Sequence, residues 1–175
     1  MNLTRKSMAS IVIVSAVVLL VAIAILWAIH SNKATNTPSL IGSIEIYGDS
    51  NAGQPGSVMC TIDVVSDTYK FPVGLCENDQ AEHINLINIP SSTTIKLYDT
   101  KDCNEKTDQN FYMFFKTTKD RVNSEAPLEL KTIIGTPVGN IVPKSGGLRM
   151  EKKYENEQVY GKLSCMTIEL GTPVP

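Results

Sequence analysis

This chain of 175 residues has few histidines, a small net charge and no closely spaced cysteines. The two histidines are His30 and His83, so no Ser-His-Asp set with a recognisable spacing lies beyond the N-terminal segment, and the sequence argues against an enzyme. The formal net charge is -2, so no basic field points to nucleic acid as a partner. The sequence also contains no Cys-x-x-Cys pair, which argues against a structural zinc site.

Charge is also absent from residues 11–29, which consist almost entirely of Val, Ile, Leu and Ala. A membrane-spanning helix needs about 20 apolar residues. Arg5 and Lys6 precede the run, and no acidic residue precedes or interrupts it, a distribution that keeps the N-terminus in the cytoplasm. We therefore expect residues 1–9 to be cytoplasmic and residues 10–30 to form a transmembrane anchor.

A cleaved signal peptide is the alternative interpretation of this segment. Signal peptides have an apolar core of roughly 7–15 residues and small residues at the cleavage site. The core here is longer, and Trp27, Ile29 and His30 do not provide such a site. Under both interpretations the remaining chain is exported. The only Asn-x-Ser/Thr sequon begins at Asn2, before the anchor, which favours a bacterial inner membrane with the C-terminal domain on the periplasmic side.

Beyond the anchor, the sequence predicts a polar linker at residues 31–42, one domain at residues 43–170 and a tail at residues 171–175. Short alternating segments rich in β-branched residues predict strands, and clusters of Gly, Pro, Asp and Ser between them predict turns. The segments are 43–47, 58–65, 83–89, 93–98 and 163–170. The continuous apolar stretch 111–115 predicts a buried strand and not a binding patch. The predicted fold class is all-β.

An internal repeat relates the two halves of the predicted domain. Residues 44–51 and 95–102 each contain an alternating segment that ends in a tyrosine, Tyr47 or Tyr98, and continues into a polar turn. Two related halves predict two Greek-key motifs packed as one sandwich.

These motifs resemble a microbial βγ-crystallin domain. The residues that carry the resemblance are Tyr47, Gly53 and 78–81 in the first motif, and 95–98, Cys103 and 160–168 in the second. The resemblance covers residues 43–170, although residues 123–157 match poorly. It implies a βγ-crystallin-like sandwich, and related small bacterial domains include metalloproteinase inhibitors as well as calcium binders.

The resemblance also implies a calcium site with the motif Asn/Asp-Asn/Asp-x-x-Ser/Thr-Ser. Asn78 and Asp79 match the start of this motif, whereas Glu82 and His83 replace its two hydroxyl residues. Glu82 still offers carboxylate oxygen, the kind of ligand that Ca²⁺ prefers. The alternative is that Asn78 and Asp79 only cap a turn.

The second copy of the calcium motif is further degraded. Ser164 matches, but Tyr160 and Gly161 stand where acids or amides are expected. The resemblance therefore implies at most a weak Ca²⁺ site that draws on Asn78, Asp79, Glu82 and Ser164, and no other cofactor is predicted.

Four cysteines lie beyond the anchor, and an even number in an exported domain predicts two disulfides. Three pairings are possible. We favour Cys60–Cys76, because these residues flank one predicted hairpin. The remaining pair, Cys103–Cys165, would join the start of the second motif to its end.

The function that we expect is a membrane-anchored, extracytoplasmic protein-binding module, in its specific form an inhibitor of an envelope or secreted hydrolase. The alternative is a calcium-binding structural domain without inhibitory activity. Arg149, Lys152 and Lys153 form a small basic cluster that we place in a loop. We interpret this cluster as a solvated patch, with an anionic partner as the alternative.

Overall fold

The computed structural model describes residues 42–49, 54–71, 76–77, 79–106, 109–156, 159 and 161–171. The predicted anchor at residues 10–30 lies outside the described residues, as does the predicted linker up to residue 41. Within the described ranges, no helix is long and apolar enough to cross a membrane.

One sheet contains four strands in the order β2–β1–β4–β7. The bounds are β1 Ser43–Asp49, β2 Pro55–Asp63, β4 His83–Ile87 and β7 Leu128–Glu129. All neighbouring pairs are antiparallel. Ile44 and Ile46 of β1 are fully buried and alternate with the half-buried Ser43 and Glu45, because successive side chains of a strand point to opposite faces.

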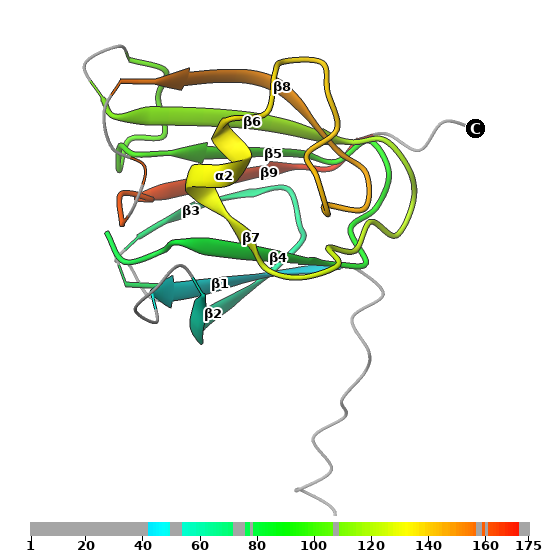
Figure 1. Cartoon of the computed structure of the whole chain (residues 1–175), viewed down its shortest axis with the longest axis horizontal. Helices are drawn as coiled ribbons and strands as arrows, with labels where there is room; N and C mark the ends of the chain where they lie inside the picture. The colour runs from blue at the N-terminus through cyan, green and yellow to red at the C-terminus, as the bar shows by residue number, and fades with distance from the viewer. Residues whose placement is uncertain are drawn as a thin grey trace, which may run out of the picture. The chain divides into compact units, whose positions relative to one another are not determined.

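The second sheet contains five strands in the order β3–β9–β5–β6–β8. The bounds are β3 Asp67–Lys70, β5 Thr94–Tyr98, β6 Phe111–Thr117, β8 Leu148–Glu155 and β9 Cys165–Glu169. These pairs are antiparallel as well. Figure 1 shows β8, β6, β5 and β9 side by side, with the short helix α2 crossing in front of the strands. The prediction of an all-β fold is confirmed at this level.

The two halves of the chain exchange one strand each. β3 follows β2 in sequence but pairs with β9 in the second sheet, whereas β7 follows β6 but pairs with β4 in the first sheet. Because each sheet is completed by a strand from the other half, neither half contains a complete sheet of its own.

The main core contains the aliphatic and aromatic side chains of both sheets. Among the fully buried side chains are Ile44, Ile46, Ile84 and Leu86 from the first sheet and Ile95, Leu97, Met113 and Phe115 from the second. Complete burial of one such side chain contributes about 1.5–3 kcal/mol relative to its exposure. The alternation of β1, β4 and β5 is thus explained by one shared hydrophobic layer.

A second, smaller cluster of buried residues draws on β5, β6 and β9. It contains Tyr98, Tyr112, Phe114 and Cys165, with Cys103 and Tyr154 packed against them. The rings of Tyr98 and Phe114 meet edge to face at 5.5 Å. Burial, reinforced by Glu105 and Glu169, raises the pKa of Tyr98 to about 12. Since Met113 and Phe115 lie in the main core, both sides of β6 are covered, and the predicted burial of residues 111–115 is confirmed.

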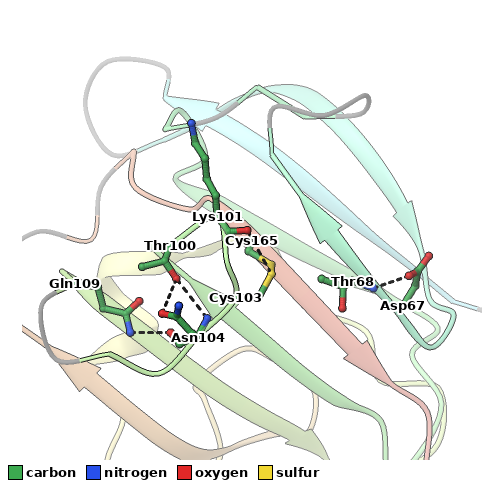
Figure 2. The surroundings of a disulfide bond; sticks show 8 residues. All are labelled: Asp67, Thr68, Thr100, Lys101, Cys103, Asn104, Gln109 and Cys165. Carbon is green, nitrogen blue, oxygen red and sulfur yellow. Dashed lines mark hydrogen bonds between the residues drawn. A yellow bond between two sulfur atoms is a disulfide. The ribbon is translucent and has the colours of Figure 1, made fainter.

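Two disulfides join Cys60 to Cys76 and Cys103 to Cys165, the two pairings that the sequence favours. The second fixes the turn after β5 to the first residue of β9 (Figure 2). The side chain of Thr100 hydrogen-bonds Asn104 within this turn, and Gln109 Nε2 donates to the Asn104 carbonyl at 2.9 Å. The loop that carries Cys103 is therefore held at several points above the aromatic cluster.

Several boundaries differ from the sequence prediction. The second strand begins at Pro55 and ends at Asp63, so Val65 lies in a turn. The strand from His83 ends at Ile87, because Asn88 has a positive φ of 53° and turns the chain. The stretch 123–157, which matches the resemblance poorly, contains β7, β8 and the one-turn helix α2 Leu130–Ile134, whose buried residues are Leu130, Ile133 and Ile134.

Candidate functional site

Two residues of the predicted calcium set meet in the structure. Ser164 is 3 % exposed, and its hydroxyl donates to Asp79 Oδ1 at 3.3 Å. Gly161 has a φ of +56° and lies so close to Asp79 that a Cβ at this position would stand 2.8 Å from the Asp79 carbonyl oxygen. The loops before β4 and β9 therefore pack together and place one carboxylate beside one hydroxyl. Asn78 and Tyr160 lie outside the described residues.

Glu82 is anchored through its backbone. Its N–H donates to the Tyr47 carbonyl at 2.9 Å, and its carbonyl accepts from the Leu130 N–H at 2.8 Å. Among the described residues, no group of three or more His, Cys, Asp and Glu is arranged to hold a metal ion. The oxygen pair of Asp79 and Ser164 is thus the part of the predicted calcium set that the structure brings into contact.

A cavity of about 400 Å³ lies beside α2, where β4 and β7 pair. Most of its wall is apolar, and His83 lines it with a side chain that is 2 % exposed. The lining residues are Gln54, Pro55, His83, Ala126, Pro127, Leu128, Glu129, Thr132, Ile133, Pro143 and Lys144. The sequence predicts His83 to pack beside a strand; in the structure it is the first residue of β4.

A second hollow of about 400 Å³ adjoins the first, since both are lined by Thr132 and Pro143. Pro137, Asn140 and Ile141 form its other side. It is open to solvent, and two large apolar side chains stand exposed in this segment of the chain. Val138 is 56 % exposed and Ile141 is 48 % exposed, the two highest values among the large hydrophobic residues of the described ranges.

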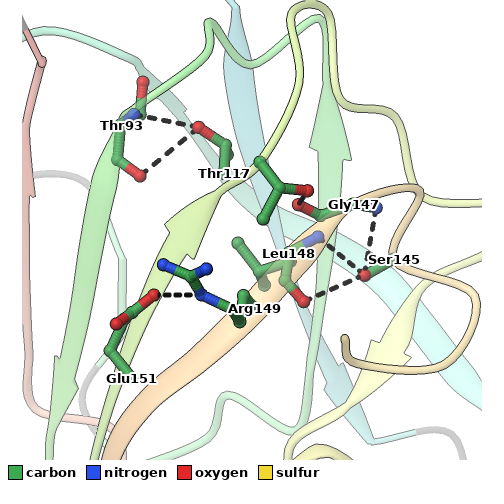
Figure 3. Close-up of polar contacts among 8 residues, drawn as sticks. Thr93, Thr117, Ser145, Gly147, Leu148, Arg149 and Glu151 are labelled. Carbon is green, nitrogen blue, oxygen red and sulfur yellow. Dashed lines mark hydrogen bonds and ion pairs between the residues drawn. The ribbon is translucent and has the colours of Figure 1, made fainter. Parts of the chain in front are cut away.

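The segment from Thr136 to Gly147, here called the apical loop, is rigidly held despite its irregular shape. The Gly139 N–H donates to the Met150 carbonyl at 2.7 Å, and the Met150 N–H donates to the Asn140 carbonyl at 2.9 Å. The buried Ser145 hydroxyl donates to the Val142 carbonyl at 2.6 Å. Figure 3 shows the same hydroxyl accepting from the Leu148 N–H, at 3.0 Å. The loop thus presents its exposed apolar side chains from a fixed backbone.

The basic cluster lies on β8, so its placement in a loop is wrong. β8 is an edge strand of the second sheet, and two of these cations reach carboxylates. Lys152 pairs with Glu105, and Arg149 Nε pairs with Glu151 at 2.6 Å. Lys153 Nζ donates to the carbonyl of Ile134, at the end of α2. All three cations are therefore engaged, which favours the interpretation as a solvated structural patch.

No family model, curated protein or solved structure matches this chain.

The apical loop and the two hollows are absent from the sequence prediction. Residues 135–147 read GTPVGNIVPKSGG, in which a few apolar residues stand among glycines and prolines. The glycines and prolines of this segment interrupt any helix or strand, so it predicts a loop. No signal in this local pattern distinguishes the exposed Val138 and Ile141 from the buried Val142.

Proposed function

We propose that this chain is an extracytoplasmic protein-binding module whose contact surface is the apical loop. The observation that carries the proposal is the pair of exposed apolar side chains, Val138 and Ile141, on a backbone fixed by hydrogen bonds to β8. A preorganised loop loses little conformational freedom when a partner binds, so more of the contact energy appears as affinity. Inhibition of an envelope or secreted hydrolase is the specific form of this proposal.

The proposal includes a βγ-crystallin-like sandwich of two Greek-key motifs. The exchange of β3 and β7 between the sheets supports it, because each half contributes three strands to one sheet and one to the other when β8 is set aside as an additional edge strand. Tyr47 and Tyr98, which mark the repeat, lie on corresponding first strands, β1 and β5, of the two halves.

The proposal is tested by changing the two exposed side chains together. We expect Val138→Asp with Ile141→Asp to lower recovery of a bound envelope hydrolase at least tenfold. The reason is that each substitution replaces an apolar anchor residue in the centre of the interface by a charged one. The measurement is a quantitative pull-down from envelope extracts with the full-length chain, followed by an activity assay of the recovered hydrolase.

Val65→Asp is the matched control, because Val65 is 36 % exposed and lies in the turn between β2 and β3. This variant should recover the same partner as the unchanged chain. Equal recovery by the loop variant and the control would remove the apical loop as the contact surface.

The location of the module depends on the apolar segment at residues 10–30. We propose an uncleaved single-pass anchor in a bacterial inner membrane with the domain on the periplasmic side. Protease added to spheroplasts should then digest the domain and leave a membrane fragment that retains Met1. Recovery of the intact domain in the soluble periplasmic fraction would contradict the anchor.

Calcium binding is the second candidate function, favoured by the contact between Asp79 and Ser164. With few charged ligands, we expect a dissociation constant on the order of 10⁻⁴–10⁻³ M, as in extracellular modules. At calcium equal to that constant, the free energy of unfolding rises by about 0.4 kcal/mol. The expected increase in melting temperature is about 1–2 °C.

Asp79→Ala should abolish this calcium-dependent increase, whereas Asp120→Ala, at an exposed aspartate in the turn after β6, should retain it. Differential scanning calorimetry of the full-length chain with and without calcium measures both. An increase of many degrees would place the calcium-binding function ahead of the protein-binding one.

A further inference from the structure

The cavity beside α2 has the composition of a small-molecule site. Its volume of about 400 Å³ falls within the range of roughly 300–1,000 Å³ that such sites occupy. Pro55, Pro127, Leu128, Ile133 and Pro143 supply a largely apolar wall, and three of these are prolines, whose rings keep their shape. A wall of this kind accepts the apolar body of a ligand and leaves selectivity to the few polar groups.

The polar group that lacks a partner in this cavity is His83. The residue is 2 % exposed and lines the cavity, and its Nδ1 atom has no hydrogen-bond partner. A buried polar atom without a partner costs free energy, so such groups are rare in native proteins and call for an explanation. A ligand that enters the cavity and engages the ring would supply one.

The charges around the cavity select the class of ligand. Glu129, opposite His83 in the β4–β7 pair, already accepts a hydrogen bond from the Thr132 hydroxyl. Lys144 also lines the cavity, and no carboxylate of the described residues forms an ion pair with its ammonium group. The uncommitted groups are therefore an imidazole, which donates one N–H when neutral, and a cation with three donors.

We propose that this cavity binds a monocarboxylate that carries a compact apolar body. The carboxylate lies between the His83 ring and the Lys144 ammonium group, and the apolar body lies against the prolines, Leu128 and Ile133. A phosphate dianion fits less well, because the second charge would face Glu129 and the apolar wall. The same chemistry is offered by a free branched acid and by the C-terminal residue of a peptide.

The two histidines of the chain make a direct test possible. Full-length protein with ¹³C-labelled histidine gives ring signals from His30 and His83 alone, so His30 is an internal control. We expect 4-methylpentanoate to shift one ring signal saturably, and His83→Gln to remove that signal. The uncharged isostere 4-methylpentanamide should bind at least tenfold more weakly. Lys144→Gln, at an exposed residue, should weaken binding of the acid several-fold without affecting the fold.

A second arm identifies the source of the carboxylate. Acetyl-Ala-Ala-Leu with a free C-terminus is compared with its C-terminal amide. Tighter binding of the peptide acid than of 4-methylpentanoate assigns the site to a chain terminus, and the reverse order assigns it to a free acid. The absence of a saturable shift, equal binding of acid and amide, or unchanged affinity in Lys144→Gln would each overturn the proposal. Val138→Asp should leave binding unaltered, which separates this site from the exposed apolar side chains Val138 and Ile141.

Discussion

Replacing Cys103 and Cys165 together by alanine is expected to lower the free energy of unfolding by about 4 kcal/mol, whereas replacing Cys60 and Cys76 should lower it by about 3 kcal/mol. The difference follows from the separations of 62 and 16 residues, because a longer closed loop restricts the unfolded chain more strongly. Urea denaturation of the full-length variants, followed by far-UV circular dichroism, measures both values.

The Cys103–Cys165 disulfide also holds the turn that carries Cys103 against Tyr98, Tyr112 and Phe114. Loss of this disulfide should therefore raise the reactivity of Tyr98 and Tyr112 towards a tyrosine-modifying reagent. Loss of the Cys60–Cys76 bond should not produce this effect. A larger destabilisation in the Cys60/Cys76 variant would show that packing around β2, and not loop length, decides the contribution of each bond.

Phe115→Ala is the second change with a large expected effect. Phe115 is fully buried between the sheets, and its removal leaves a cavity in the main core, so the free energy of unfolding should fall by about 3–5 kcal/mol. Phe114→Ala is the matched control on the opposite face of the same strand. Its ring is 8 % exposed, and the Nζ atoms of Lys96 and Lys152 lie 5.6 and 5.8 Å from its centroid.

We expect Phe114→Ala to lower the free energy of unfolding by less than Phe115→Ala does, by about 3 kcal/mol. The long side chains of Lys96 and Lys152 can close over the smaller residue, whereas two hydrogen-bonded sheets have less freedom to approach each other. Urea denaturation of the two variants gives the comparison directly. A reversed order would mean that the aromatic cluster, and not the layer between the sheets, is the more tightly packed region.

The strands with one buried and one exposed face could be predicted from the sequence. β1 and β5 alternate because only one face of each meets the main core, and β6 is continuously apolar because both of its faces are covered. β3, with the sequence DTYK, has no such pattern, since it is a short edge strand with mostly exposed side chains. β7 has two residues, and its pairing depends on the position of β4, which a local pattern does not encode.

The candidate sites were predictable to different degrees. Asp79 and Ser164 could be named because the resemblance places both in equivalent motifs, and their contact is present. His83 was predicted as a packed residue, but the cavity that it lines is formed with residues of α2 and with Pro143, which lie far away in sequence. The exposure of Val138 and Ile141 likewise depends on how β8 holds the apical loop.

The exchange of β3 and β7 has a consequence for the order of events during synthesis. When the ribosome has made the first half, β4 still lacks its neighbour β7 and β3 has no sheet to join, because β9 ends only at Glu169. The edge of β4 therefore stays unpaired until β7 emerges, and β3 and the apolar face of the second sheet stay incompletely covered until β9 emerges. A nascent chain of this design therefore needs protection from aggregation until nearly all of it has been synthesised. A truncation that removes only β9 would leave β3 without any partner strand and β5 without its partner opposite β6.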